Sequence, residues 1–338
     1  MIKRIHSAAP IRICDIGGWT DTWFAGHGAV FNIAVYPYVE VQIEIHERKA
    51  PEEGIVVNVE NFGDTYTVNP DRITYTKHPL IEAAIEVMEI PNDLSFVITV
   101  HSAAPPGAST GTSAAVSVAL IGALVSLTKG RLTPHEVAAL AHSIETEKLK
   151  LECGIQDQLC SAYGGVNYIQ MHRFPKASVS SIQIPNALWW ELESRLAVVY
   201  IGAPHSSSEI HTKVINDLGA NAQNDPRLVE LRRLAAQAKN ALYAGDFELL
   251  GQTMDGNTRV QRALHKDLVC DKFDDIIAIA GQYKALGCKV NGAGGDGGSL
   301  TILTDGEAST KRRMLKTIRE SGYDVLQIYL SRYGLRVW

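Results

Sequence analysis

Apolar and polar residues follow two different spacings along this chain, and both recur from one end to the other. Period-two alternation and β-branched runs predict strands at residues 30–45, 55–59, 94–101, 166–171, 195–201, 299–304 and 323–330. Spacings of three and four residues predict helices at residues 113–128, 134–150, 208–218, 226–244, 246–264, 272–286 and 307–321. Strands and helices thus recur in both halves, which indicates an α+β fold of two associated lobes with a functional site between them. The loop near residues 173–190 is the expected boundary, dividing the chain into residues 1–180 and 181–338.

The bulk composition adds little to this fold but excludes several classes of protein. Lys and Arg number 32 and Asp and Glu 37, a formal net charge of −5, and the basic residues are scattered, so no nucleic-acid surface is expected. Five widely spaced cysteines without a CxxC pair predict reduced thiols rather than a disulfide framework or a zinc site. The longest apolar stretch, residues 114–127, is too short to span a bilayer, so we expect a soluble, cytoplasmic protein with no membrane partner.

A loop rich in glycine, serine and threonine, PPGASTGTS at residues 105–113, lies between the strand at 94–101 and the helix at 113–128. Gly107 and Gly111 let the backbone bend and approach a ligand closely, and the following helix N-terminus offers free N–H groups. These features suit a polyphosphate, although a strand-to-helix turn capped by serine and threonine has the same composition. The loop is not a Walker A motif, because no lysine follows Gly111.

A second glycine-rich segment, NGAGGDGG at residues 291–298, has five glycines in its last seven positions. An ordinary β-turn uses one or two glycines, so this density indicates unusual backbone dihedrals or a close approach to another group. We therefore favour a functional loop here over a simple connection between the flanking strand-like segments.

Two carboxylates near the middle of the chain admit both a functional and a structural interpretation. The helix that begins after Thr133 places Glu145 on the same face as Ala138 and Ala141. A carboxylate over such a packed face requires a cation or a hydrogen-bond donor, whereas at the edge of the face it is an ordinary surface residue. Asp157, in the segment GIQDQ, is either a buried base or the N-cap of a helix.

The segment APIRICDIGGWTDT at residues 9–22 carries an arginine inside an apolar strand pattern. A buried Arg12 is costly unless an anion pairs with it, and the alternative is a side chain that faces solvent. Two glycines, Trp19 and Asp21 follow, and this composition is also compatible with an ordinary turn.

These segments occur in one order along the chain: RIxxxGGWTDT, PPGxxxGTSAA, a glutamate, GIQDQ followed by YGG, and KVNGAGGDGG. Each motif alone is weak, but the ordered set is specific and resembles the GHMP kinases, named for galactokinase, homoserine kinase, mevalonate kinase and phosphomevalonate kinase. The resemblance spans residue 8 to about residue 303. It implies a two-lobed kinase fold, with a ribosomal-protein-like N-terminal ATP-binding domain at residues 1–180 and a ferredoxin-like α+β C-terminal domain at residues 181–338.

The resemblance also implies roles for individual residues. Asp157 matches the catalytic aspartate that orients or deprotonates the attacking hydroxyl, and Arg12 matches an arginine beside it that supports the phosphoryl transition state. Ser113 and Glu145 match ligands of Mg²⁺. The implied substrate-binding residues are Gly18, Trp19, Asp21, Gly294 and Gly295. The residues implied to wrap the ATP phosphates are Pro106, Gly107, Ala108, Ser109, Thr110, Gly111, Thr112 and Ser113.

The expected substrate follows from the same motifs. GGWTDT resembles the sugar-binding pattern of L-fucose kinases, and GIQDQ with YGG resembles heptose-phosphate kinases and galactokinases. The resemblance therefore implies transfer of the γ-phosphoryl group of ATP, with Mg²⁺, to a sugar hydroxyl, specifically the anomeric one, by a monomer or homodimer. The alternatives are a kinase for a non-sugar alcohol such as mevalonate or an inositol, or a catalytically silent sugar-sensing homologue.

Several residues depart from the family pattern. Ser109 and Thr110 stand where Gly-Leu is usual, and Gly18 and Trp19 replace the Glu-His of galactokinases. Asp296 adds a negative charge to the glycine-rich loop.

Overall fold

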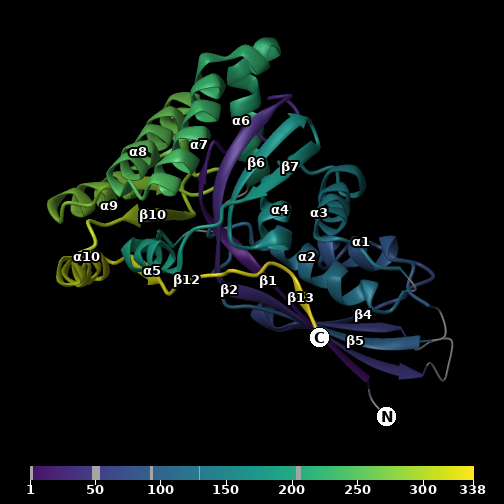
Figure 1. The fold of residues 1–338 in the computed structure, drawn as a ribbon. Helices are drawn as coiled ribbons and strands as arrows, with labels where there is room; N and C mark the ends of the chain where they lie inside the picture. Colours follow the sequence, from purple (N-terminus) through teal and green to yellow (C-terminus); the bar gives the residue numbers. More distant parts are fainter. Residues whose placement is uncertain (1–2, 48–53, 92–93, 129, 203–206) are drawn as a thin grey trace.

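The computed structural model describes residues 3–47, 54–91, 94–128, 130–202 and 207–338, and contains two β-sheets with helices packed around them (Figure 1). The strands of the larger sheet are β1 (Lys3–Ile16), β2 (Gly28–Glu47), β3 (Ile55–Val59), β4 (Asp64–Val68), β5 (Leu94–Ser102), β6 (Val166–Arg173), β7 (Lys176–Ser181), β12 (Tyr329–Leu330) and β13 (Arg336–Val337). Their order is β13-β1-β2-β5-β3-β4, with β6 and β12 also paired to β2, and β7 to β6. Neighbours are antiparallel except β3 and β5.

The long β1–β2 pair runs through the middle of this sheet, because both strands are rich in the β-branched and apolar residues that pack well on a pleated surface. Its register shifts twice, after Pro10 and after Ile13. The irregular end of β1 carries Arg12 and Asp15 and leads directly into the loop that carries Asp21. The sheet therefore places these charged residues at one end of its central strands.

Helices α1 (Pro79–Val87), α2 (Thr112–Val125), α3 (Pro134–Ser143) and α4 (Gln156–Tyr163) lie together beside this sheet (Figure 1), with a π-helical turn at Ile144–Lys148 and a 3₁₀ turn at Glu60–Phe62. Helix α2 is central, because it contacts β1, β2 and the other three helices. Its alanines Ala114, Ala115 and Ala119 are buried. At Gly122 a side chain would collide with Leu335, so this glycine permits the C-terminal segment to pack on α2.

The smaller sheet has the order β11-β8-β10-β9 and is antiparallel throughout, with β8 (Leu196–Tyr200), β9 (Gly287–Val290), β10 (Ser299–Leu303) and β11 (Asp324–Leu326). The remaining helices are α5 (Asn186–Arg195), α6 (Ser207–Leu218), α7 (Pro226–Ala244), α8 (Phe247–Leu264), α9 (Asp271–Gln282) and α10 (Ala308–Glu320), with 3₁₀ turns at Gly219–Asn224 and Lys266–Leu268. Helix α7 contacts β2 and α8 contacts β9, so this helical pair joins the two sheets. No helix in the described ranges is long and apolar enough to cross a membrane.

The α+β fold is confirmed, and strand 55–59 and helix 226–244 have their predicted bounds. The predicted helix 134–150 is α-helical only to Ser143 and continues as a π-helical turn to Lys148. The predicted helix 272–286 ends at Gln282, because Lys284 adopts a left-handed φ of 57°. The predicted strand 323–330 is divided, since β11 pairs with β8 whereas β12 crosses to β2. Helices α1, α4 and α5 were not predicted.

The last residues of the chain pair with the larger sheet. Strand β13 pairs with β1, and the backbones of His6 and Trp338 exchange hydrogen bonds of 2.9 Å. The division into residues 1–180 and 181–338 stays a prediction, and these pairings attach the C-terminal strands to the N-terminal sheet.

Candidate active site

A cavity of about 720 Å³ lies where the end of β1, the start of α2, the π-helical turn, α4 and the glycine-rich loop meet. Six of the residues singled out in the sequence line it: Arg12, Trp19, Asp21, Ser113, Glu145 and Asp157. The other predicted site residues do not line this cavity: Gly18, Pro106, Gly107, Ala108, Ser109, Thr110, Gly111, Thr112, Gly294 and Gly295. The fold therefore brings the predicted charged, hydroxyl and aromatic side chains together in one cavity wall. Most of the predicted loop residues lie outside that wall.

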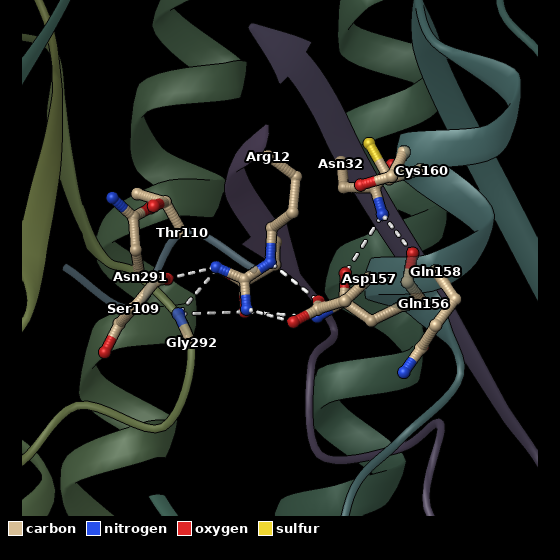
Figure 2. Close-up of polar contacts among 12 residues, drawn as sticks. Arg12, Asn32, Ser109, Thr110, Gln156, Asp157, Gln158, Cys160, Asn291 and Gly292 are labelled. Atoms are coloured by element: carbon tan, nitrogen blue, oxygen red, sulfur yellow. Dashed lines mark hydrogen bonds and ion pairs between the residues drawn. The ribbon is translucent and has the colours of Figure 1, made fainter. Parts of the chain in front are cut away.

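Arg12 and Asp157 form a partly buried ion pair in the wall of this cavity (Figure 2). Arg12 Nε and Nη2 donate to the two carboxylate oxygens of Asp157 at 2.8 and 2.9 Å. Arg12 is 4% exposed, whereas the Asp157 side chain is 25% exposed, so the carboxylate remains accessible from the cavity. The surface-facing alternative for Arg12 is wrong. The N-cap alternative for Asp157 is also wrong, because Ile155 occupies that position and Asp157 lies in the first turn of α4.

The loop at residues 105–113 is attached to both halves of the molecule. Arg12 donates from Nη1 to the carbonyl of Ser109, and Figure 2 shows the guanidinium between this carbonyl and Asp157. From the smaller sheet, Tyr200 donates its hydroxyl to the carbonyl of Pro106 at 3.0 Å. Ser299 donates to the carbonyl of Ala108 at 2.6 Å. The loop is therefore held in one conformation by groups from β1, β8 and β10.

The end of this loop forms the N-terminus of α2. Gly111 has a φ of 69°, and a Cβ there would lie 3.1 Å from a carboxylate oxygen of Asp157, so glycine permits this close approach. No side chain caps α2, which leaves its first N–H groups free for an anion. The alternative of a turn capped by serine or threonine is therefore wrong. Ser113, in the first turn of α2, is exposed and lines the cavity.

Glu145 lies in the π-helical turn and is buried together with Ala138 and Ala141, as the helical spacing predicts. Burial raises the pKa of Glu145 to about 7; the hydrogen bond that its Oε1 accepts from Gln158 at 2.7 Å opposes this shift, and the charge of Asp157 adds to it. Glu145 takes part in none of the ion pairs formed among the described residues. The surface alternative is wrong, and such a carboxylate fits a role in holding a bound cation.

A cation at Glu145 would need ligands beyond the protein carboxylates. No group of three or more His, Cys, Asp or Glu side chains in the described ranges could hold a metal ion by itself. Mg²⁺ is commonly bound by one or two protein groups together with substrate phosphates, and the hydroxyl of Ser113 and the carboxylate of Glu145 supply groups of that kind.

Asp21 is also buried in the cavity wall, at 3% exposure. Its Oδ2 accepts a hydrogen bond of 3.1 Å from the backbone N–H of Gln156. Burial raises the pKa of Asp21 to about 6, and the charge of Asp157 contributes to the shift while the Gln156 bond opposes it. Gly154 makes room for this carboxylate, since a Cβ there would lie 1.9 Å from Oδ2.

The glycine-rich loop meets the cavity through its first residues only. The N–H of Gly292 donates to both carboxylate oxygens of Asp15, at 3.0 and 3.1 Å. Further along, the N–H of Gly295 donates to the carbonyl of Leu268 at 3.0 Å, and a Cβ on Gly294 would collide with that same carbonyl. The assignment of Gly294 and Gly295 to the substrate therefore stays a prediction.

A buried ion pair that was not predicted from the sequence lies beside the site. Lys289 Nζ lies 3.3 Å from Asp15 Oδ1, and both residues are 1% exposed. Burial alone would raise the pKa of Asp15, but the charges of Lys289 and Arg12 and the Gly292 N–H hold it below its usual range. The pair joins β1 to β9 and so fixes the glycine-rich loop. A lysine in the apolar segment GCKV was the available signal, of the same kind that drew attention to Arg12.

The geometry agrees with comparisons to known proteins. Residues 79–165 match the family model described as GHMP kinases N terminal domain. The chain is 32% identical to a mevalonate kinase from Thermococcus sibiricus over 352 residues, which cover 99% of this chain and 98% of the relative. It is 27% identical to the D-glycero-alpha-D-manno-heptose 7-phosphate kinase of Campylobacter jejuni over 246 residues, 72% of this chain and 71% of that one.

A solved structure shows the same fold. The galactokinase of Lactococcus lactis, crystallised with galactose, matches 99% of this chain and 95% of its own, with a TM-score of 0.71 at 16% identity. The full-length relative, the family model and the buried Arg12–Asp157 pair beside an uncapped helix N-terminus lead to one conclusion. This chain belongs to the GHMP kinases, phosphotransferases that use ATP as the phosphate donor and an alcohol as the acceptor.

Proposed function

We propose that this chain is a sugar kinase that transfers the γ-phosphoryl group of ATP to a sugar hydroxyl, specifically the anomeric one. The observation that carries the proposal is the position of Asp21, a buried carboxylate in the same cavity as Asp157. Its partner Gln156 is the neighbour of Asp157 in the chain, so the two carboxylates lie close together. A carboxylate beside the reacting hydroxyl can accept hydrogen bonds from further hydroxyls, which a sugar presents on adjacent carbons.

In this proposal Asp157 orients the attacking hydroxyl and accepts its proton. Arg12 holds both oxygens of that carboxylate and also the carbonyl of Ser109, so it sets the distance between the base and the phosphate loop. The positive charge of Arg12 also stabilises the negative charge that develops on the transferred phosphoryl group. Trp19 provides an apolar surface for the C–H face of a sugar.

The loop at residues 106–113 and the free N–H groups of α2 would bind the ATP phosphates. Ser113 and Glu145 would hold Mg²⁺, which supplies positive charge to the phosphate oxygens when it is bound. Gly18, Gly294 and Gly295 are proposed to shape the substrate side, with Gly292 closer to the cavity.

Two relatives support a sugar as the acceptor, and one supports a second candidate. The heptose 7-phosphate kinase and the galactokinase with galactose both act on or bind sugars according to their names. The second candidate is mevalonate, because the mevalonate kinase aligns with nearly the whole chain at the higher identity.

A screen of purified enzyme coupled to ADP release tests the proposal. The panel contains fucose, galactose, mannose, heptose 7-phosphate and glucuronate, together with mevalonate, homoserine and myo-inositol. We expect ATP-dependent turnover of at least one sugar, abolished in the Asp157→Asn variant as a control for contaminating kinases. Turnover confined to mevalonate, homoserine or inositol would contradict the sugar assignment and leave the kinase family unaffected.

A further inference from the structure

Trp19 forms an aromatic pair with His211 in the wall of the cavity, and the chemistry above gives no role to His211 or to this pairing. Their ring centroids are 4.8 Å apart at an interplanar angle of 44°. Trp19 comes from the loop after β1, two residues before Asp21, and is 6% exposed. His211 comes from α6, so the pair joins segments nearly 200 residues apart at the same cavity.

Each ring carries a buried polar atom without a hydrogen-bond partner. These atoms are Trp19 Nε1 and His211 Nδ1. Buried polar groups are nearly always paired in folded proteins, because an unpaired one loses its hydrogen bonds to water without replacement. Both residues line the cavity, so a ligand hydroxyl bound at this wall could accept from the indole N–H and bond to the imidazole nitrogen.

The imidazole is uncharged at neutral pH. Burial lowers the pKa of His211 to about 4. The pair therefore offers hydrogen-bonding atoms and ring surface, but no positive charge, to a group in the cavity.

The other charges of the cavity wall also disfavour an anionic acceptor. Among the described lining residues, the positive charges belong to Arg12 and Lys148. Arg12 is held by Asp157, and Lys148 Nζ lies 2.7 Å from a carboxylate oxygen of Glu86. Asp21, by contrast, lines the cavity with no cation beside it in the ion pairs of the described chain. A phosphate or carboxylate group near Asp21 would meet negative charge.

We propose that Trp19 and His211 determine acceptor specificity, and that the acceptor is an uncharged polyol whose hydroxyl bonds Trp19 Nε1 and His211 Nδ1. This inference rests on the proposed sugar kinase function and narrows it to an unphosphorylated, non-acidic sugar.

Matched neutral and charged acceptors test the charge of the substrate. The comparisons are galactose with galactose 6-phosphate and with galacturonate, fucose as a further neutral sugar, heptose with heptose 7-phosphate, and myo-inositol and mevalonate as non-sugars. We expect kcat/KM for a neutral sugar to exceed that for its charged counterpart by at least about tenfold.

The outcomes separate this inference from the proposed function. A preference for heptose 7-phosphate or galacturonate overturns the inference and leaves the sugar kinase intact. Turnover of myo-inositol alone overturns the sugar kinase but keeps the uncharged acceptor. Turnover of mevalonate alone, or of no uncharged compound, overturns the inference.

Single substitutions test the two hydrogen-bonding atoms. Trp19→Phe keeps an aromatic ring and removes Nε1, and His211→Phe removes Nδ1. We expect each to raise the KM of the acceptor by roughly three- to tenfold, the range for one hydrogen bond, with the KM of ATP within about twofold of wild type. Matched controls are Trp190→Phe and His172→Gln at exposed positions outside the cavity, which should leave both constants unchanged.

Equal changes in both KM values, or no change in either, would overturn the assignment of these two atoms. A gain-of-function variant covers the case in which a ring substitution unfolds the protein. His211→Arg places a cation in the wall of the cavity that Asp21 also lines, and it should shift the ratio of kcat/KM for galacturonate over galactose upward by at least about fivefold. An unchanged or lower ratio in a folded His211→Arg protein counts against His211 as a specificity residue.

Discussion

Arg12 holds Asp157 through two parallel hydrogen bonds while a third guanidinium nitrogen holds the carbonyl of Ser109. One buried cation therefore fixes the carboxylate and the phosphate loop relative to each other. The two residues are 145 positions apart in the chain, and the geometry requires β1, α4 and the loop before α2 to be in place together. Loss of either charge leaves the other partly unpaired in a buried setting, so activity and folding must be measured side by side.

Asp157→Asn should lower kcat by at least roughly 100-fold, because the amide cannot accept the proton of the attacking hydroxyl. The change is nearly isosteric, so ATP binding should survive. Steady-state kinetics and an ATP-binding titration measure the two effects, with circular dichroism as the test of folding. Asp71→Asn at an exposed position is the matched control. Near-normal turnover in Asp157→Asn would reduce Asp157 to a structural partner of Arg12.

Glu145→Gln should weaken binding of ATP with Mg²⁺ far more than binding of ATP without metal. The reason is that the amide removes the protein charge closest to the proposed cation while keeping the side chain's shape. Glu147→Gln is a close control, because Glu147 lies in the same π-helical turn but is exposed. Calorimetric titrations with and without Mg²⁺ would measure both variants. An equal loss under both conditions argues for a purely structural Glu145.

Asp21→Asn should stabilise the ligand-free protein above pH 6. The folded pKa of about 6 exceeds the ordinary value of 3.8, so the wild type loses stability as pH rises from about 4 through 6, when the buried carboxyl must ionise. The asparagine variant avoids this loss, which reaches at most about 3 kcal/mol. Thermal unfolding at pH 4 and pH 8 should show a difference between the proteins at pH 8 that shrinks at pH 4. A stability difference of equal size at pH 4 and pH 8 would rule out ionisation of Asp21 as its cause.

The same substitution should impair the acceptor site. Asp21→Asn replaces a charged hydrogen-bond acceptor, so the KM of the sugar should rise by about tenfold while that of ATP stays nearly constant. A parallel rise in both values would show that Asp21 supports the fold of the site and does not contact the acceptor.

Lys289→Met should destabilise the protein by about 3–5 kcal/mol, because it leaves the Asp15 carboxylate buried without its cation. The double variant Lys289→Met/Asp15→Leu removes both charges and should recover part of that loss. Thermal unfolding of the three proteins measures the effect. A double variant at least as unstable as Lys289→Met would mean that packing at these positions, and not charge pairing, determines stability.

The sequence by itself determined the fold class, many of the helices and strands, and the kinase family. Periodicity located strands such as 55–59 and helices such as 226–244, because it reports which face of a local segment is buried. The ordered motifs identified Arg12, Glu145 and Asp157 and the kinase family. Local spacing and residue type were enough for the helices and strands, whereas the family and the expected residue roles came from the resemblance of the ordered motifs to GHMP kinases.

The tertiary structure decided whether Arg12, Glu145 and Asp157 are surface or cap residues or are packed in the cavity wall. A carboxylate such as Asp157 has the same local sequence whether it caps a helix or pairs with Arg12, and the partner comes from a strand 145 residues away. The Asp15–Lys289 pair and the contact of Trp19 with His211 likewise join distant segments. Periodicity cannot show such partners, because which buried groups meet depends on how separate elements pack, and only folding brings those elements together.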